Sequence, residues 1–350
     1  MGFAVKVEAK NAEGVRRFLQ SMNLLEGRKQ VSHDSEFVIF PVNDLVTQGE
    51  EAKVIELGGE LIEFEAVERK DEYDSIEDAL KGQLTEEELK GLVKGFDIVG
   101  DIATIEIPEE LEAKEKLIAQ ALMSVHKNVN VVCKKVSGRH GAFRVQGLTV
   151  IAGENRTETL YSEHGCRMKV DLSKAYFSPR LSTERKIIAE KVKEGETVAV
   201  LFAGVGPYAF VICKEQPLVG KVYAVELNPD AVNYLEENVK LNKVEGTVMP
   251  LLEDAGKACR EELRGKCDRV IMPLPHEAQN FLDDAIKALK AEGGFIHFYQ
   301  FCEEGKFKEA EDKVTEAASR AGRKVKTEET RKVGMHSPRV YRVCVDALIT

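Results

Sequence analysis

From about residue 175 onward, short apolar runs alternate with stretches of helical periodicity. The apolar runs predict strands at 197–202, 221–226, 247–252, 269–272 and 295–299. Between them, apolar residues recur at helical spacing over 231–239 and 278–289. Near-continuous apolar strands that alternate with helices are typical of a parallel sheet covered on both faces. Two further β-like runs, at 324–333 and 339–348, are expected to pair as an antiparallel edge of this sheet.

The preceding half of the chain has a mixed pattern that predicts two smaller α+β domains. The first shows strand-like alternation at 3–9, helical spacing at 11–25 and further strand-like runs at 37–40 and 53–57. A charged, apolar-poor run at 65–75 predicts a linker. The second domain is expected to contain a polar helical stretch at 76–96, a strand-turn-strand unit at 97–107 and an amphipathic helix at 111–124. We therefore expect an α/β chain with domains at 1–66, 74–172 and 173–350.

Composition excludes several classes of protein. No stretch approaches about 18 uninterrupted apolar residues, so no membrane span is expected, and the N-terminus lacks the order of a signal peptide. The seven cysteines form no CxxC pair, which favours free thiols in a reducing cytoplasm over a disulfide framework. The seven histidines form no HxxxH or HExxH motif, so no metal site is expected.

The stretch around Gly204 and Gly206 predicts a nucleotide-type site. The strand at 197–202 runs into these glycines, and Pro207 suits the first turn of a following helix. Glu226 lies twenty residues after Gly206, at the end of the next strand, where a carboxylate can accept both hydroxyls of a ribose. Asp254 follows the third strand and could face the edge of a base. S-adenosylmethionine fits this pattern at least as well as NAD, since it has no pyrophosphate; a glycine turn that only packs helix on strand is the alternative.

Six motifs in order give the chain a resemblance to a known family. They are FRV at 143–145, AGENRT at 152–157, YFSPRL at 176–181 with ER at 184–185, FAGVGP at 202–207, ELNP at 226–229 and LN at 241–242. The sequence resembles the archaeal/eukaryotic-type tRNA (guanine-N1)-methyltransferases, which methylate the guanosine just 3′ of the anticodon. The resemblance covers residues 90–350 and, more loosely, the first 66.

The resemblance implies a class I (Rossmann-like) S-adenosylmethionine methyltransferase domain at the C-terminus. It implies Glu184 as general base, Arg144 as the group that stabilises O6, and a catalytic Asn228. The cofactor residues that it implies are Phe202, Gly204, Gly206, Glu226, Asp254 and Arg180. The substrate-binding candidates are Tyr176, Phe177, Pro273 and Pro275. The implied partner is tRNA, contacted at its anticodon loop and outer corner, and we expect a cytoplasmic monomer with no bound metal.

The chemistry of guanine N1 calls for such groups. N1 carries a proton near neutral pH, so a carboxylate within hydrogen-bond reach must remove it, and an arginine can stabilise the charge that spreads onto O6. Taken without the resemblance, Glu184 reads as a carboxylate favoured by a helix N-terminus. Arg144 reads as a surface arginine, and Tyr176 and Phe177 read as core residues.

Two positions depart from the family pattern. Val200 stands where an Asp is expected, and Pro273 replaces an asparagine expected to hold the target base, although Pro275 is kept. An aminocarboxypropyl transferase of the wybutosine pathway and a catalytically altered tRNA-binding paralogue therefore remain alternatives. A generic NAD enzyme has the least support.

The net charge of −10 does not exclude RNA, because the charges are unevenly placed. Residues 123–190 contain twelve basic and six acidic residues, a net charge of +6. A second group of basic residues lies between 320 and 339. This distribution predicts a localised basic groove whose affinity for tRNA falls with salt.

Overall fold

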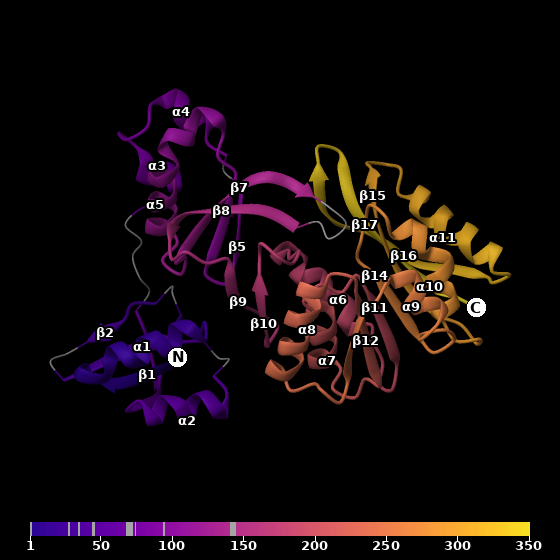
Figure 1. Cartoon of the computed structure of the whole chain (residues 1–350), viewed down its shortest axis with the longest axis horizontal. Coiled ribbons are helices and arrows are strands. Elements are labelled where there is room, and N and C mark those ends of the chain that lie inside the picture. The colour runs from indigo at the N-terminus through magenta and orange to yellow at the C-terminus, as the bar shows by residue number, and fades with distance from the viewer. Residues whose placement is uncertain are drawn as a thin grey trace. The chain divides into compact units, whose positions relative to one another are not determined.

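The computed structural model describes residues 2–26, 29–33, 36–43, 46–67, 73, 75–93, 95–140 and 145–350. The chain divides into two compact units (Figure 1). Of the described residues, the first unit comprises those within 2–140, 145–162 and 171–173, and the second comprises 163–170 and 174–350. The finer division into domains at 1–66, 74–172 and 173–350 stays a prediction.

The first unit begins with a small antiparallel sheet of order β2-β3-β1-β4. Its strands are β1 (Gly2–Glu8), β2 (Ser32–His33), β3 (Phe37–Val42) and β4 (Gly59–Phe64). The short helix η1 (Ala9–Asn11) leads into α1 (Ala12–Ser21), and α2 (Gln48–Glu56) precedes the last strand. Val5 and Val7 of β1 pack with Val15 and Leu19 of α1 in the core of this part.

The predicted strand at 53–57 is wrong, because these residues belong mainly to α2. Thr47 and Glu50 form a capping box, in which each side chain satisfies a backbone N–H group of the other residue. Within the apolar run, Val54 is buried but Ile55 is 61 % exposed, as one face of a helix requires. A run this short does not distinguish a strand from a helix by periodicity alone.

The first unit also contains a second sheet, of order β5-β6-β7-β8. Its strands are β5 (Phe96–Val99), β6 (Ile102–Ile105), β7 (Val131–His140) and β8 (Val145–Gly153), and η2 (Glu109–Lys114) with α5 (Glu115–Val125) joins β6 to β7. The stretch expected to be helical over 76–96 forms two short helices, α3 (Ile76–Leu80) and α4 (Glu86–Gly91). Gly82 interrupts it with a φ of +75°, and Ser75 and Thr85 cap the two helices separately.

The second unit is built on a seven-stranded sheet of order β13-β12-β11-β14-β15-β17-β16. Its strands are β11 (Thr197–Leu201), β12 (Lys221–Glu226), β13 (Val248–Leu252), β14 (Arg269–Met272), β15 (Gly294–Glu303), β16 (Val325–Ser337) and β17 (Val340–Ile349). The first five strands in this order run parallel, and β17 is antiparallel to both β15 and β16. The expected antiparallel edge is therefore confirmed.

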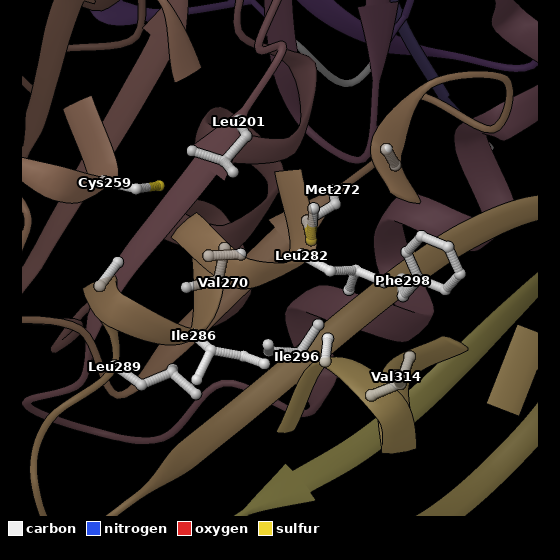
Figure 2. Packing of buried hydrophobic residues seen from close by; sticks show 14 of the residues in the cluster. Leu201, Cys259, Val270, Met272, Leu282, Ile286, Leu289, Ile296, Phe298 and Val314 are labelled. Atoms are coloured by element: carbon white, nitrogen blue, oxygen red, sulfur yellow. The ribbon is translucent and has the colours of Figure 1, made fainter. Parts of the chain in front are cut away.

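Helices cover both faces of this sheet (Figure 1). One face carries α6 (Ser182–Glu190), α7 (Pro207–Glu215) and α8 (Pro229–Leu241), and α9 (Ala255–Arg260), α10 (Leu282–Ala288) and α11 (Lys308–Arg320) cover the other. Two 3-10 helices, η3 (Pro179–Leu181) and η4 (Ala278–Phe281), precede α6 and α10. Figure 2 shows the apolar core on the second face, where Val270, Ile286 and Phe298 pack together. The order of strands reverses between β11 and β14, and ligands of open α/β sheets bind beyond the carboxyl ends of the strands at such a point.

A two-stranded sheet of β9 (Glu158–Glu163) and β10 (Cys166–Asp171) precedes α6 in the chain. Two asparagines of α8, four residues apart, bind the backbone of β10. Asn242 accepts from the Arg167 N–H at 3.0 Å and donates to its carbonyl at 2.7 Å. Asn238 does the same with Lys169, at 2.7 and 3.0 Å. The two side-chain amides therefore take the place of a neighbouring strand.

Candidate active site

The loop after β11 is shaped by three residues with positive φ. Phe202, Gly204 and Gly206 have φ angles of +57°, +56° and +95°. A Cβ on Gly206 would lie 2.4 Å from Leu235 and 2.6 Å from Phe210, so this glycine lets α7 and α8 pack closely. A Cβ on Gly204 would meet only the Tyr176 carbonyl oxygen, at 3.5 Å, so Gly204 serves the turn itself.

Glu226 ties this loop to the end of β12. Its Oε2 accepts the Gly204 N–H at 2.8 Å, and its Oε1 accepts the N–H groups of Leu227 at 2.8 Å and Asn228 at 2.9 Å. A carboxylate has about four lone-pair sites, so these three donors leave one strong site, on Oε2, for a ligand hydroxyl. The carboxylate therefore both fixes the glycine loop and offers an acceptor beside it.

Two other predicted residues cap helices at the same edge of the sheet. Asp254 accepts the Lys257 N–H at 2.8 Å through Oδ1, at the start of α9. Asn228 accepts the Asp230 N–H at 3.0 Å, at the start of α8, and its Nδ2 donates to the Lys174 carbonyl at 2.7 Å. Both atoms of the buried Asn228 amide are therefore engaged in holding the segment that precedes Tyr176.

The segment 176–181 reaches from this edge to α6. Tyr176 and Phe177 are half-buried, and Arg180 is exposed. The guanidinium of Arg185 lies 5.5 Å from the centre of the Phe177 ring, which is a cation–π contact. Arg185 is itself buried and pairs with Glu163 through two contacts of 2.5 Å. In the ER motif at 184–185, Arg185 therefore anchors α6 through its pair with Glu163, whereas Glu184 contacts other residues.

Glu184 lies in the first turn of α6 and is only 4 % exposed. The Tyr299 O–H group donates to Oε1 at 2.5 Å. Arg331 donates to Oε1 through Nη2 at 2.5 Å and to Oε2 through Nε at 3.1 Å, which is a bidentate ion pair. These donors fill three lone-pair sites, and the fourth lies on Oε2.

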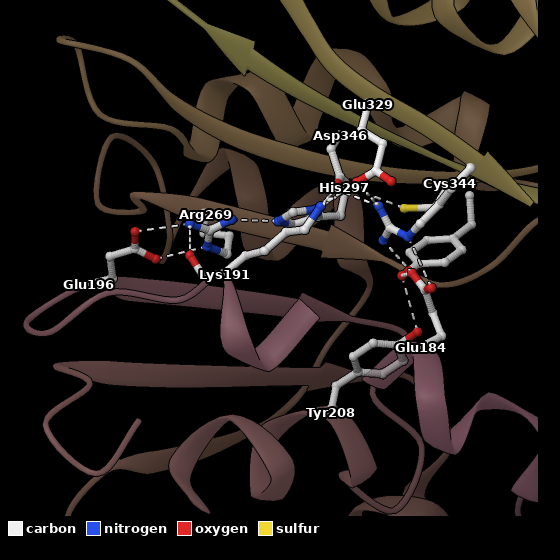
Figure 3. A network of polar contacts seen from close by, with 11 residues as sticks. Glu184, Lys191, Glu196, Tyr208, Arg269, His297, Glu329, Cys344 and Asp346 are labelled. Carbon is white, nitrogen blue, oxygen red and sulfur yellow. Dashed lines mark hydrogen bonds and ion pairs between the residues drawn. The ribbon is translucent and has the colours of Figure 1, made fainter. Parts of the chain in front are cut away.

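Beyond Arg331, the polar contacts continue through the interior of the second unit (Figure 3). Arg331 also pairs with Asp346 at 2.5 Å, and Asp346 binds Nδ1 of His297 at 2.6 Å. His297 binds Arg269 through Nε2 at 2.6 Å, and Arg269 pairs with Glu196 at 2.8 Å. We call the residues Glu184, Arg331, Asp346, His297, Arg269 and Glu196, together with Lys191, the buried network.

The charge state of the network follows from its partners. Burial lowers the pKa of His297 below its ordinary value, and the contact with Asp346 does not reverse this, so the ring is neutral. Burial opposes ionisation of Asp346, but its contacts with His297, Lys191 and Arg331 hold the pKa well below the usual range. Burial likewise opposes the charge on Arg331, yet the hydrogen bond to Glu184 raises the pKa of the guanidinium.

The remaining positions singled out by the sequence are the two prolines after β14, Arg144 and Val200. Pro273 and Pro275 follow β14 directly, in a turn where the Leu274 N–H donates to the Met272 carbonyl at 2.8 Å; Pro275 is buried and Pro273 half-buried. Arg144 lies outside the described residues. Val200, where an Asp was expected, is fully buried within β11 and pairs with Ile271.

Sequence reasoning missed Arg331, Tyr299, Asp346 and His297. Arg331 falls within the basic group between 320 and 339, and no sequence motif contains His297. The available signal was the presence of His297 and Asp346 in runs that are otherwise apolar, since buried ionisable groups need partners.

The described residues offer neither a suitable metal site nor a membrane-spanning helix. His297, Cys344 and Asp346 form the one group of at least three possible metal ligands in the described part of the chain. Arg331, Lys191 and Arg269 already contact this group, so its surroundings are unsuited to a cation. Among the described helices, none has the length and apolarity needed to cross a membrane.

Three family models match the chain along its length. The TRM5/TYW2 methyltransferase domain matches residues 159–326, the TYW2 N-terminal domain 76–157, and the tRNA methyltransferase 5 N-terminal domain 4–50. The chain is 39 % identical over 347 residues to the Pyrococcus abyssi protein named tRNA (guanine(37)-N(1))-methyltransferase Trm5b, which covers 99 % of this chain and 98 % of that protein.

Comparison with solved structures points to the same family. The complex of aTrm5 with tRNALeu gives a TM-score of 0.69 at 31 % identity, covering 99 % of this chain and 100 % of that one. Methanocaldococcus jannaschii TYW2 in complex with AdoMet gives 0.57 at 29 % identity, covering 73 % of this chain and 99 % of that one. The Rossmann-like fold expected for the C-terminal part is confirmed. The chain belongs to the TRM5/TYW2 methyltransferase family.

Proposed function

We propose that this protein methylates N1 of the guanine that follows the anticodon of tRNA, with S-adenosylmethionine as the methyl donor and Glu184 as the base. The Pyrococcus abyssi relative with this named activity aligns over nearly the whole chain. The observation that carries the proposal is the Glu184 carboxylate, which is buried, ion-paired and left with one acceptor site. It lies in the helix that begins directly after segment 176–181, which packs beside the glycine loop.

The residues beyond β11 and β12 fit S-adenosylmethionine. Gly204 leaves the loop without a side chain at its turn, Glu226 offers a carboxylate oxygen for a ribose hydroxyl, and Asp254 lies at the end of the next strand. Phe202, Gly206 and Arg180 complete the proposed cofactor residues. S-adenosylmethionine supplies an electrophilic methyl group on a sulfonium, which needs no metal ion.

The chain's own residues then have defined tasks. The fourth lone pair of Glu184, on Oε2, would accept the proton of guanine N1, which leaves the N1 electron pair free to take the methyl carbon while the bond from this carbon to the sulfonium sulfur breaks and the sulfur leaves as a neutral thioether. The negative charge spreads to O6, where we assign its stabilisation to Arg144. Because N1 lies on the Watson–Crick edge, the base must leave its stack, and this costs less in an anticodon loop than in a duplex. Tyr176, Phe177, Pro273 and Pro275 are the proposed walls of its pocket.

The engaged amide of Asn228 favours a positioning task over a catalytic one. Its two hydrogen bonds fix the start of α8 and the backbone just before Tyr176. Through this backbone, Asn228 sets the place of the segment that leads to Glu184.

Nucleoside mass spectrometry of tRNA after incubation with the protein and S-adenosylmethionine tests the proposal. We expect N1-methylguanosine, and we expect Glu184→Gln to lower kcat by about 10²–10⁴-fold, because the amide cannot accept the proton. Calorimetry should show unchanged S-adenosylmethionine binding by this variant. Glu190→Gln, which changes an exposed carboxylate on the same helix, is the matched control. Full methylation by Glu184→Gln would refute the role of the base.

Aminocarboxypropyl transfer is the second candidate, because the fold also matches a TYW2 protein. The same experiment separates the two, since an aminocarboxypropyl group adds far more mass than a methyl group. The higher identity and fuller coverage of the Trm5b relative favour methylation. A tRNA-binding protein without catalysis would give neither product, and failure to bind S-adenosylmethionine in calorimetry would favour it.

A further inference from the structure

The partner of Glu184 comes from a distant part of the chain. Arg331 follows Glu184 by 147 residues and belongs to β16, at the edge of the sheet. Its side chain is only 12 % exposed and joins two buried carboxylates, those of Glu184 and Asp346. Its guanidinium contacts a carboxylate oxygen of each at 2.5 Å.

The register of three strands explains how these groups meet. His297 of β15 lies opposite Asp346 of β17, which lies opposite Glu329 of β16. One step of two residues along, Tyr299 lies opposite Cys344, which lies opposite Arg331. Alternate residues share a face of a sheet, and opposite or diagonal neighbours are in reach of one another. The two rows therefore place Tyr299 and Arg331 on the face that α6 covers, where Glu184 points toward them.

We propose that Arg331 is a positioning residue for the base: it keeps the buried Glu184 carboxylate ionised and directs its remaining lone pair to the substrate, while Asp346 fixes the guanidinium. This rests on the proposed function. A buried carboxylate without a counter-ion would take up a proton, and a protonated Glu184 could not accept the proton of N1. The bidentate contact also fixes the rotation of the carboxylate.

Arg331 is one of two cations among three carboxylates. Glu184, Asp346 and the more exposed Glu329 supply three negative charges, and Arg331 and Lys191 supply two positive ones. On the far side of His297, Arg269 and Glu196 balance each other. Lys191 pairs with Asp346 and Glu329, so loss of Arg331 leaves Glu184 without the cation that pairs with it.

The two tyrosines and the cysteine near Glu184 are neutral at working pH. Burial raises the pKa values of Tyr299 and Tyr208, and of the Cys344 thiol. Tyr208 of α7 donates to Tyr299 at 3.3 Å, so the two phenols form a short chain that ends on Glu184. Arg185, the neighbour on α6, is already paired with Glu163. Arg331 is therefore the cation in direct contact with the base among the described residues.

Arg331→Met tests the proposal through its pH signature. We expect kcat to fall at least tenfold at pH 7, with little change in the KM for tRNA or in S-adenosylmethionine binding. We expect the deficit to shrink as pH rises, because a higher pH restores the ionised carboxylate. Arg331→Lys, which keeps the charge but not the bidentate contact, should give an intermediate kcat and a pH profile near that of the parent.

The controls separate the possible failures. Lys287→Met removes an exposed cation of α10 outside the buried network and should leave kcat and its pH profile unchanged. If the parent protein methylates tRNA and Arg331→Met has the parent's kcat at every pH, the positioning proposal is wrong. If the parent does not methylate tRNA, it is the proposed function that fails. Should Arg331→Met not fold, Arg331→Lys decides: a kcat equal to the parent's at every pH would overturn the proposal, and an intermediate kcat with the parent's pH profile and unchanged S-adenosylmethionine binding would support it.

Discussion

At the scale of single residues, the two glycines after β11 have different tasks although the motif presents them alike. Gly206 has α7 and α8 packed against the place where a Cβ would stand, and Gly204 has only a carbonyl oxygen at van der Waals distance. The sequence predicted a glycine turn, and it left open whether the glycines serve a ligand or helix packing. The structure assigns packing to Gly206, which makes it the more sensitive position for stability.

Gly206→Ala should therefore destabilise the second unit strongly. The left-handed backbone costs about 1–2 kcal/mol with a Cβ, and overpacking against Leu235 and Phe210 adds about 1–3 kcal/mol. Gly195→Ala is the matched control, since Gly195 has a φ of +74° but nothing within 4 Å of a Cβ. Urea unfolding of both variants measures the difference, and equal losses of unfolding free energy would show that the clash is absorbed.

The sequence singles out Glu184 as a candidate, but it does not indicate which side chains surround it. Its place after YFSPRL made it the candidate base by resemblance, while spacing alone suggested a helix N-terminal carboxylate. Arg331 and Tyr299 approach it through the pairing of β15, β17 and β16. Such a meeting depends on strand register across more than a hundred residues, which local periodicity does not encode.

At the scale of elements, the docking of β10 on α8 depends on Asn238 and Asn242. Each amide satisfies both the N–H and the carbonyl group of one residue of β10, and Asn238 also donates to the Val205 carbonyl at 3.1 Å. Helical spacing had predicted α8 from its apolar residues, and LN at 241–242 was seen only as part of a motif. Its physical task becomes visible when the strand edge is in place.

Asn238→Ala should lower the unfolding free energy of the second unit by about 2 kcal/mol or more, because buried backbone groups of Lys169 and Val205 lose their partners. Asn233→Ala, an exposed asparagine of the same helix, should change it little. Hydrogen exchange gives a second readout, since the Lys169 amide should lose protection only in Asn238→Ala. Equal stabilities of the two variants would contradict the proposed docking.

The strongly patterned elements were predictable and the short ones were not. The parallel strands from β11 to β15 follow directly from their apolar runs, and the antiparallel pair β16 and β17 was predicted from two β-like runs. Residues 53–57 were mistaken for a strand because a five-residue run fits both periods. Thr47 and Glu50, a capping pair in the sequence, were the signal that could have corrected this.

At the scale of the whole molecule, many of the basic residues that predicted a tRNA-binding groove form ion pairs with acidic residues. Arg156 pairs with Asp101, Lys134 with Glu115 and Lys169 with Glu237. In the C-terminal basic group, Arg320 pairs with Asp283, and Arg331 is part of the buried network. The charge count therefore exceeds the positive charge that these residues offer to a phosphate backbone.

The buried network also makes the stability of the second unit dependent on pH. The pKa of His297 is lowered from its ordinary 6.5. At a pH just below 6.5, His297 is therefore protonated in the unfolded chain but neutral in the folded protein. The unfolding free energy is therefore greatest above about pH 6.5 and falls as pH decreases through this range. The depressed pKa of Asp346 adds a loss at more acid pH, below the ordinary carboxyl value.

His297→Gln should reduce this dependence. Urea midpoints at pH 7.5 and pH 5.5 should differ less in His297→Gln than in the parent, because the variant has no imidazole to protonate on unfolding. His276→Gln, at an exposed histidine, should keep the parent's difference. If all three proteins lose the same stability on acidification, His297 does not contribute to it.

The distance along the chain between Glu184 and Arg331 has a consequence for biosynthesis. The two residues are 147 positions apart, so at about 5–20 residues per second a ribosome adds Arg331 roughly 7–30 s after Glu184. During this interval α6 and the parallel strands up to β15 can emerge, but the carboxylate still lacks its counter-ion. The ion pair of the proposed base therefore forms only after β16 has been synthesised and has joined the sheet.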